Sequence, residues 1–354
     1  MSLFKSSKSF LGVDIGTASL KIVELSQSGN KKKLENYGEM AASAFFDKPF
    51  RTLDKNSLLL SDTEVARAIT GILKEAKIKT KKAIFSIPDF STFFTYFELP
   101  FMTKEELPQA INFEAKQHVP LPLNEVTLDW QIIDQQISER NKTKLKILLV
   151  AVPNEIIYQY QNIAKMTQLQ VSSLEAEVFG LTRSLVKDEE KAVVCIVDFG
   201  AQSTTINIID KKTLKRSHSC DISGNQLTQI IMKSLGVDFN EAESSKQKYG
   251  LLPSEKNIRD IMLPFIDLAI VDVESISQDF YLSEGKEVQK IILAGGTALI
   301  PGFKEYFSEN LKKEVEIADP FYNIFYPSVL EKKIKKMGPS YAIAVGVALR
   351  GLEL

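Results

Sequence analysis

Cysteine and histidine are scarce in this sequence of 354 residues, which contains two of each. Cys195 and Cys220 form no C-x-x-C motif and are too few for a disulfide framework, as is typical of a reducing compartment. His118 and His218 are far apart and show no metal-ligand spacing, so no zinc site is predicted. No apolar run approaches the roughly 18 residues of a membrane-spanning helix. We therefore expect a cytoplasmic protein without a membrane span.

An excess of charge of either sign is also missing, because 44 basic and 45 acidic residues leave a net charge of −1. This balance argues against a dedicated nucleic-acid-binding protein, which needs a basic surface. Small basic clusters at residues 31–33, 79–82 and 332–336 are interpreted as solvated turns or helix faces. The P-loop motif G-x-x-x-x-G-K-[ST] and the dinucleotide motif G-x-G-x-x-G are absent, so neither of those folds is supported.

One short stretch, in contrast, occurs twice. Residues 13–25 read VDIGTASLKIVEL and residues 197–209 read VDFGAQSTTINII, an offset of 184 positions that keeps Val, Asp, Gly and Ser in register. Each copy has the pattern of a strand, a tight turn and a second strand. A single Asp-x-Gly is usually only a hairpin turn, but the repeat favours a duplicated site. Two facing hairpins would bind a phosphate chain, and Asp14 and Asp198 would hold Mg²⁺.

Three further groups of residues are candidates for the same site. Gly295, Gly296 and Thr297 follow a predicted strand, where backbone without Cβ can lie against a base or ribose; an ordinary turn is an equally good interpretation. Glu243 and Lys246 share one helix face and could bind a ribose, although a surface ion pair is favoured. Glu177 opens a helix. It either positions an attacking water or is an ordinary acidic residue of the first turn, which the helix dipole favours.

The predicted elements alternate between strands and helices, which indicates an α/β fold. Residues 83–170 show the order strand, strand, helix twice and are interpreted as an inserted module, while residues 41–60 are interpreted as a loop. The predicted strands cover residues 10–15, 20–26, 34–40, 83–88, 92–99, 126–133, 145–152, 169–174, 192–198, 203–209, 214–219, 289–293 and 314–317. Helices are predicted over residues 62–77, 103–117, 154–166, 175–185, 224–235, 240–249, 257–282 and 340–349, with another starting at Pro301.

These features resemble the actin-like ATPase superfamily and, more closely, the PilM family of type IV pilus assembly. The resemblance runs along nearly the whole chain. It is carried by residues 12–17 with Lys21, Phe97-Glu98-Leu99-Pro100-x-Met102, Phe113-Glu114-Ala115 with His118-Val119-Pro120, Ala242-Glu243-x-x-Lys246-x-x-Tyr249-Gly250, and the segments 224–228, 295–302 and 344–350. The segment around Phe113 is the part most specific to this family.

The resemblance implies an α/β, actin-like (ribonuclease H-like) two-lobed ATPase fold with an inserted subdomain of the FtsA/PilM type. Residues 1–82 plus 171–190 would form the first core subdomain, and the helix at 340–350 would pack on it. Residues 83–170 would form the inserted α+β subdomain. The second lobe would combine a core subdomain, residues 191–222 plus 286–354, with a helical subdomain, residues 223–285.

The resemblance also implies ATP and Mg²⁺ as cofactors, with Asp14 and Asp198 as the metal-binding residues. The implied first phosphate loop contains Asp14, Gly16, Thr17, Ser19 and Lys21, the second contains Asp198, Gly200, Ala201 and Ser203, and the adenosine-side positions are Glu243, Lys246, Gly295, Gly296 and Thr297. Glu177 matches the acidic residue near the attacking water. Because Ala201 and Gln202 stand where hydroxylated residues are common, we expect ATP binding with weak or no hydrolysis.

For partners, the resemblance implies that a groove between the inserted module and the first core subdomain binds the N-terminal cytoplasmic peptide of a PilN-like inner-membrane protein. This partner would hold the protein at the inner membrane, near other pilus assembly proteins including the motor ATPases. An alternative is a filament-forming, membrane-tethering division protein like FtsA. The sequence stops directly after the closing helix, which counts against the amphipathic tether of FtsA. A sugar or acetate kinase is a third interpretation, but no substrate pocket is indicated.

Overall fold

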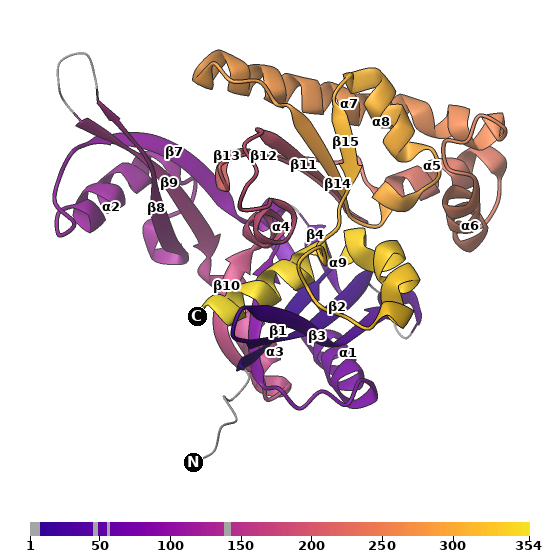
Figure 1. The fold of residues 1–354 in the computed structure, drawn as a ribbon, viewed down its shortest axis with the longest axis horizontal. Helices are drawn as coiled ribbons and strands as arrows, with labels where there is room; N and C mark the ends of the chain where they lie inside the picture. Colours follow the sequence, from indigo (N-terminus) through magenta and orange to yellow (C-terminus); the bar gives the residue numbers. More distant parts are fainter. Residues whose placement is uncertain (1–7, 45–48, 55–56, 138–142) are drawn as a thin grey trace.

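The computed structural model describes residues 8–44, 49–54, 57–137 and 143–354. The chain forms two lobes, and a smaller module projects from the side of the first lobe (Figure 1). In the described part of the chain, no helix combines the length and the apolar character needed to cross a membrane.

The first lobe is built on a five-stranded sheet with the order β10-β6-β1-β2-β3. Its strands are β1 (Lys8–Ile15), β2 (Ser19–Ser28), β3 (Lys31–Ala41), β6 (Lys82–Ile87) and β10 (Gln170–Ala176). β1 and β2 form the first predicted hairpin, and β6 runs parallel to β1 and to β10. The segment predicted to be a loop contains a small separate hairpin, β4 (Arg51–Asp54) and β5 (Ser57–Leu60). This hairpin places Arg51 beside the cleft between the lobes.

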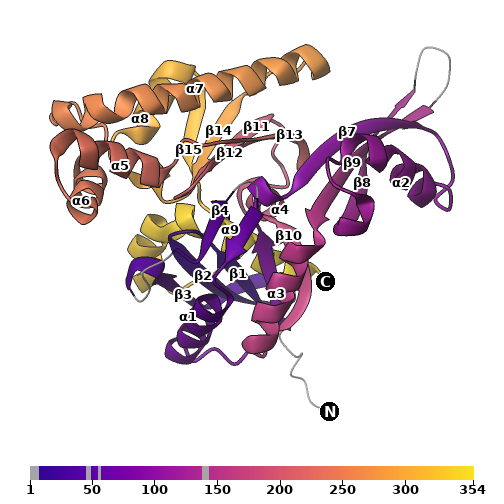
Figure 2. The ribbon, with the colours of Figure 1, turned by 180° about the vertical axis from the view of Figure 1, so that it is seen from behind.

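Two pairs of helices cover the two faces of this sheet (Figure 2). Apolar residues of β1 and β2 pack against α1 (Asp62–Glu75) and α3 (Asn154–Met166) on one face. On the other face lie α4 (Glu177–Leu185) and α9 (Glu331–Glu353). A Cβ on Gly12 would lie 1.9 Å from the carbonyl oxygen of Ala344, so β1 and α9 are in close backbone contact. The closing helix α9 thus packs on the sheet of the first lobe, with Ala344 and Ala348 against β1.

The second lobe repeats this topology. Its sheet has the order β13-β12-β11-β14-β15, in which an antiparallel three-stranded meander is again followed outward by parallel strands. The strands are β11 (Val194–Phe199), β12 (Thr204–Asp210), β13 (Thr213–Cys220), β14 (Lys290–Ala294) and β15 (Glu314–Ile317). The helices are α5 (Gly224–Leu235), α6 (Phe239–Tyr249), α7 (Lys256–Glu284) and α8 (Phe303–Leu311). The sequence repeat therefore reflects a duplicated lobe.

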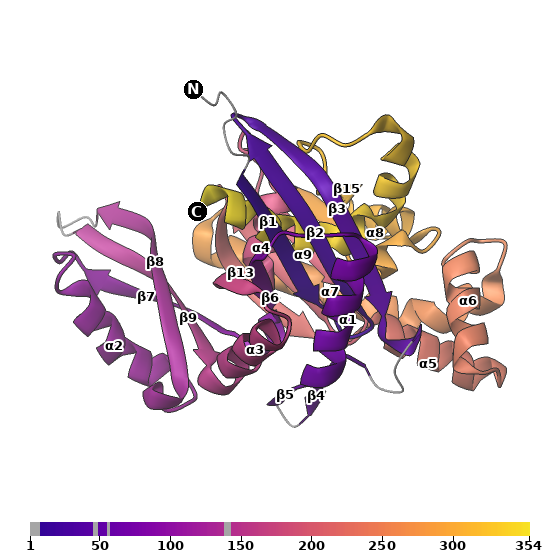
Figure 3. The ribbon, with the colours of Figure 1, turned by 90° about the horizontal axis from the view of Figure 1, so that it is seen from below.

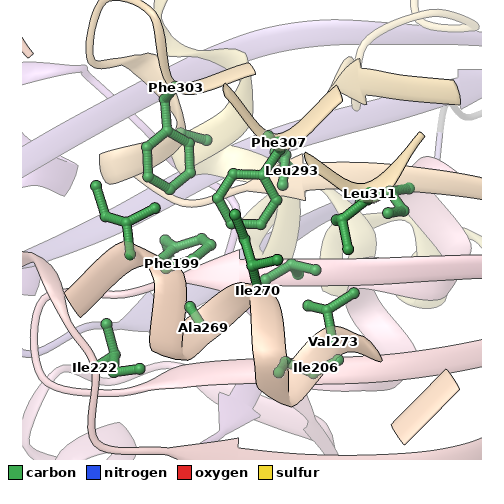
Figure 4. Packing of buried hydrophobic residues seen from close by; sticks show 14 of the residues in the cluster. Phe199, Ile206, Ile222, Ala269, Ile270, Val273, Leu293, Phe303, Phe307 and Leu311 are labelled. Atoms are coloured by element: carbon green, nitrogen blue, oxygen red, sulfur yellow. The ribbon is translucent and has the colours of Figure 1, made fainter. Parts of the chain in front are cut away.

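The core of the second lobe lies between β11, β12 and the helices α7 and α8 (Figure 4). Phe199, at the end of β11, meets Phe303 edge-on at 4.9 Å between ring centroids. Phe307 packs beside both rings. This contact fixes the end of β11, so the turn after Phe199 starts from a rigid position.

The projecting module is smaller than predicted. It consists of a three-stranded antiparallel sheet, β7-β9-β8, with one helix, α2. Its elements are β7 (Phe93–Pro100), α2 (Leu107–His118), β8 (Val126–Ile137) and β9 (Thr143–Pro153). The predicted boundaries at 83 and 170 are corrected, because β6 is a central strand of the first lobe and α3 packs on that lobe's sheet. Figure 3 shows the module standing apart from the two lobes.

Candidate functional site

The two repeated hairpins adopt the same turn. The backbone N–H of Gly16 donates to the carbonyl oxygen of Ser19 at 3.1 Å, and that of Gly200 donates to Ser203 at 3.0 Å. A Cβ at Gly16 would lie 2.6 Å from the Ser19 oxygen, and one at Gly200 would lie 2.7 Å from the Ser203 oxygen. Real Cβ atoms do not approach this closely. Glycine is therefore required at both turns by the hydrogen bond that closes each of them.

These turns face one cavity of about 490 Å³ between the two lobes. Every site residue predicted from the sequence lines it. These are Asp14, Gly16, Thr17, Ser19, Lys21, Glu177, Asp198, Gly200, Ala201, Ser203, Glu243, Lys246, Gly295, Gly296 and Thr297. The volume is suited to a ligand of nucleotide size.

Carboxylates gather at the floor of the cavity. Asp14 is buried at the end of β1 and accepts a hydrogen bond from the Ser86 hydroxyl at 3.0 Å. Burial, together with the negative charges of Glu177 and Asp14, raises the pKa of Asp198 to about 7. The described residues contain no cluster of three or more acidic, histidine or cysteine side chains arranged to hold a metal. Two aspartates fit Mg²⁺ bound mainly through phosphate oxygens and water.

Lys21 supplies positive charge to the first hairpin. Its ammonium group donates to the hydroxyl of Ser19 at 2.8 Å and lies 3.8 Å from the carboxylate of Glu39. The side chain is largely buried. A cation held at this point favours an anionic ligand over the turn.

A buried ion pair that was not predicted from the sequence lines the cavity between the lobes. The guanidinium of Arg51 contacts the Glu177 carboxylate at 2.7 Å, and both side chains are nearly inaccessible. The second oxygen of Glu177 accepts the backbone N–H of Asp89 at 3.4 Å. Asp89 in turn accepts the N–H of Val178 at 3.0 Å. Burial raises the pKa of Glu177, and Arg51 opposes this effect.

Arg51 escaped prediction because it lies in a segment without clear periodicity, interpreted as a loop. Asp89 follows Pro88 and reads as an ordinary surface turn. Only the pairing of β6 inside the first lobe places this turn beside the start of α4. The sequence carries no local signal for such a contact.

The second lobe provides a polar pocket on its helical side. The Lys246 ammonium donates to the Gly224 carbonyl oxygen at 2.9 Å and to the Thr228 hydroxyl at 2.8 Å, and it pairs with Glu243 at 2.6 Å. Lys246 is only 3 % exposed. The favoured interpretation of a surface ion pair is therefore wrong. A Cβ on Gly224 would lie 2.7 Å from the hydroxyl of Thr297. Helix α5 therefore begins directly against the segment Gly295-Gly296-Thr297, which we call the glycine loop.

Gly295 brings this glycine loop against the second hairpin. Its φ angle is +82°, and a Cβ there would lie 2.3 Å from the Phe199 carbonyl oxygen and 2.8 Å from an Asp198 carboxylate oxygen. Only glycine fits this position. Gly296, in contrast, has open space at its Cβ position, and backbone faces the cavity there.

The two lobes touch across the cleft through their hairpins. The hydroxyl of Thr17 donates to the side-chain oxygen of Gln202 at 3.2 Å. Gln202 was recognised from the sequence only as a departure from the family pattern. Other lining residues that were not predicted include Asn225 and Phe239.

A second cavity, of about 530 Å³, lies between the module and the first lobe. Apolar side chains of Leu148, Val150 and Phe179 line it together with charged groups. Arg183 forms a two-pronged contact with Glu175 at 2.7 Å for each hydrogen bond. The remaining lining residues are Asp129, Trp130, Gln131, Thr182, Lys212, Arg350 and Glu353. We call this cavity the module groove.

Comparisons with known proteins agree with this architecture. The cell division protein FtsA of Buchnera aphidicola (subspecies Acyrthosiphon pisum) is 26% identical over 294 residues, covering 71% of this chain and 68% of the relative. FtsA of Staphylococcus epidermidis is 20% identical over 358 residues, covering 88% and 74%.

Among solved structures, a PilM-PilN type IV pilus biogenesis complex matches with a TM-score of 0.82 and 21% identity, covering 97% of this chain and 98% of the other. EutJ, an ethanolamine utilization protein from Carboxydothermus hydrogenoformans, has a TM-score of 0.60 at 16% identity, covering 96% and 89%. MreB5 of Spiroplasma citri bound to AMPPNP has a TM-score of 0.53 at 12% identity, covering 97% and 95%. The predicted actin-like α/β fold is confirmed.

The family assignment rests on the whole chain. The model of the family described as type IV pilus assembly protein PilM matches residues 12–352, which include both hairpins, the module and the closing helix. This chain belongs to the PilM family of type IV pilus assembly proteins.

Proposed function

We propose that the protein binds Mg-ATP between its lobes and acts as a cytoplasmic adaptor in type IV pilus assembly. The main support for nucleotide binding is that every predicted site residue lines one cavity of about 490 Å³. The turns at Gly16 and Gly200 would hold the phosphates, and Asp14 and Asp198 would hold Mg²⁺ through them.

The helical side of the second lobe would hold the adenosine. Gly295 and Gly296 give the base a surface without side chains, and Glu243 reaches the cavity with its carboxylate partly exposed. The N-terminus of α5, which has 12 residues, begins at Gly224 beside the second hairpin. The N–H groups of Gly224 and Asn225 bond to the carbonyl oxygens of Gly200 and Ala201, so α5 would favour a phosphate through its helix dipole.

Hydrolysis should be slow. Glu177, the candidate for positioning water, uses one oxygen on Arg51 and the other on the Asp89 backbone. A carboxylate that already has these partners must exchange one of them before it can orient a water molecule. This arrangement favours a nucleotide-dependent switch over a fast enzyme.

A titration with a fluorescent ATP analogue and Mg²⁺ tests the nucleotide site. Asp14→Asn and Lys246→Met should each weaken binding at least tenfold, because they remove a metal ligand and a buried cation. Lys233→Met, an exposed lysine on α5, is the matched control. No binding by the wild type, or equal binding by all four proteins, would reject the nucleotide site. A phosphate-release assay then measures turnover.

The partner half of the proposal concerns the module groove. We propose that it binds the N-terminal cytoplasmic peptide of a PilN-like inner-membrane protein, with apolar side chains against Val150 and Phe179. An extended peptide in such a groove gains backbone hydrogen bonds as well as apolar burial. The PilM-PilN complex among the similar structures supports this assignment.

Anisotropy of a labelled PilN-like peptide tests the groove. Val150→Glu puts a charge among the apolar lining residues and should abolish binding, whereas Val271→Glu on the exposed face of α7 should not. Equal affinity for both variants would reject this groove as the site. Repeating the titration with and without Mg-ATP gives the direction of any coupling.

An FtsA-like filament protein is the second candidate, because FtsA proteins match much of the chain. Sedimentation of the purified protein with Mg-ATP distinguishes the two. Filaments together with no peptide binding would favour the division-type function.

A further inference from the structure

Two lysine clusters that are far apart in the sequence lie close together in the fold. Residues 31–33 form the start of β3, and residues 332–336 lie in the first turns of α9. The segment before α9 connects them, because the backbone of Phe325 bonds to Lys32 and Leu34 at 2.9 Å each. Phe325 and Lys33 are partners in a parallel bridge. The segment thereby extends the edge of the first sheet beyond β3.

The side chains along this edge keep the clusters together. The ammonium group of Lys333 lies 5.2 Å from the centre of the Tyr37 ring on β3, so α9 begins over the sheet edge. Val329 lies in the short turn immediately before α9, three residues from Lys332. Lys332 and Lys336 are four residues apart on α9 and share its exposed face. Figure 3 shows β3 and the start of α9 on one side of the molecule.

Most lysines on this surface are not neutralised. Lys33 pairs with Glu35, and Lys335 pairs with Glu331. Within the described residues, the other five lysines have no ion-pair partner within 4.0 Å. These are Lys31, Lys32, Lys332, Lys333 and Lys336. Of these, Lys333 lies over the Tyr37 ring, and Lys32 is near enough to Asp188 to help lower the pKa of that carboxylate. A surface with more ammonium groups than carboxylates attracts a surface of negative charge.

Exposed apolar side chains stand among these lysines. Phe325 is 64% exposed and Val329 is 86% exposed, although both adjoin well-packed residues such as Ile324 and Ile334. Neither residue lines the cavities of the nucleotide site or the module groove. Large exposed apolar groups inside a basic surface are a pattern of proteins that insert shallowly into lipid headgroups.

We propose that this surface, the lysine–Phe325 patch, binds directly to an anionic lipid bilayer. The patch consists of Lys31, Lys32, Lys332, Lys333, Lys336, Phe325 and Val329. The ammonium groups of the patch would contact lipid phosphates, and Phe325 and Val329 would enter the headgroup region. Clusters of four to eight basic residues next to apolar groups are recognised by anionic membranes in this way.

Helix α9 links the patch to the module groove. Its first turns carry Lys332 and Lys336, and its last turns place Arg350 and Glu353 in the groove. Along α9, Lys332 and Arg350 are separated by about 27 Å, at a rise of about 1.5 Å for each residue. The patch is independent of both ligands in the proposed function, so its test needs neither ATP nor peptide.

Co-sedimentation with vesicles tests the patch. The full-length protein should sediment with phosphatidylcholine vesicles containing phosphatidylglycerol and remain in solution with pure phosphatidylcholine. Binding should fall steeply between about 0.1 M and about 0.5 M salt, because the attraction is screened. Lys332→Gln with Lys336→Gln should weaken binding roughly 10- to 30-fold. Phe325→Ser with Val329→Ser should weaken it as well, at unchanged charge.

The matched control replaces Lys165 and Lys233, two exposed lysines elsewhere, by Gln. This variant loses the same net charge and should bind as the wild type does. Equal loss in the control would show attraction to overall charge and would overturn the patch. So would the absence of wild-type binding to anionic vesicles, as expected if an acidic protein or a nucleic acid occupies the surface. Circular dichroism checks that each variant is folded.

Discussion

Thr17 on the first hairpin donates a hydrogen bond to Gln202 on the second, 3.2 Å away, across the cleft between the lobes. A serine or threonine hydroxyl at position 202 would be too short to make this contact, so the length of Gln202 joins the two turns.

Replacing Gln202 by Ala should make the cleft easier to open. The hydrogen bond contributes about 1 kcal/mol, so release of a bound fluorescent ATP analogue should speed up several-fold in stopped-flow displacement. Thr17→Val should have a similar effect, and the double variant should add little to either single change. Additive effects would mean that the two side chains act separately.

Gly200→Ala should damage the second hairpin. The new Cβ would lie 2.7 Å from the Ser203 oxygen, so the turn must shift and its closing hydrogen bond must weaken. We expect a loss of about 1–3 kcal/mol in unfolding free energy, measured by urea denaturation, together with weaker nucleotide binding. Gly296→Ala is the control for the stability measurement alone, because its Cβ meets open space but faces the cavity. A neutral Gly200→Ala would contradict the turn geometry.

Arg51→Met should destabilise the protein by about 3–5 kcal/mol, because it leaves Glu177 buried without its cation. Chemical denaturation measures this loss. The double variant Arg51→Met with Glu177→Leu removes both charges and should recover much of the stability. If the double variant is no better than Arg51→Met alone, the cost comes from packing and not from the unpaired carboxylate.

Asp89→Asn should stabilise the protein at neutral pH. Burial and the charge of Glu177 raise the pKa of Asp89 well above its ordinary 3.8, so the fold favours the protonated form. This contribution is fully present at low pH and is lost as the pH rises through the raised pKa. The melting temperature of Asp89→Asn should therefore exceed that of the wild type at pH 8, with a gap that narrows toward pH 5. A constant gap would exclude titration of Asp89 as its cause.

The sequence predicted which residues line the cavity between the lobes better than it predicted the boundaries of the module. The two hairpins carry a local signal, Asp-x-Gly between alternating apolar residues, and the repeat supplied the rest. The glycines at 16 and 200 are required by contacts only three residues away, so a short window of sequence contains the physical cause.

The errors concern contacts between distant parts of the chain. β6 was assigned to the module because residues 83–170 repeat the order strand, strand, helix, yet its parallel pairing with β1 and β10 depends on segments about 70 and 90 residues away. Lys246 was interpreted as part of a surface ion pair because Glu243 lies three residues away on the same helix face, and the contact with the start of α5 that buries it is not visible in the sequence. Local patterns report turns and helix faces; they do not report which elements meet.

The position of α9 also bears on how the chain folds during synthesis. β1 and β2 leave the ribosome early, but the helix that covers one face of their sheet begins only at Glu331. Until then, Val23 and Leu25 have no helix to pack against, and the first lobe exposes an apolar surface that favours aggregation. The first lobe therefore cannot finish folding before the second lobe has been synthesised. Although its strands are synthesised first, it is the last lobe to be completed.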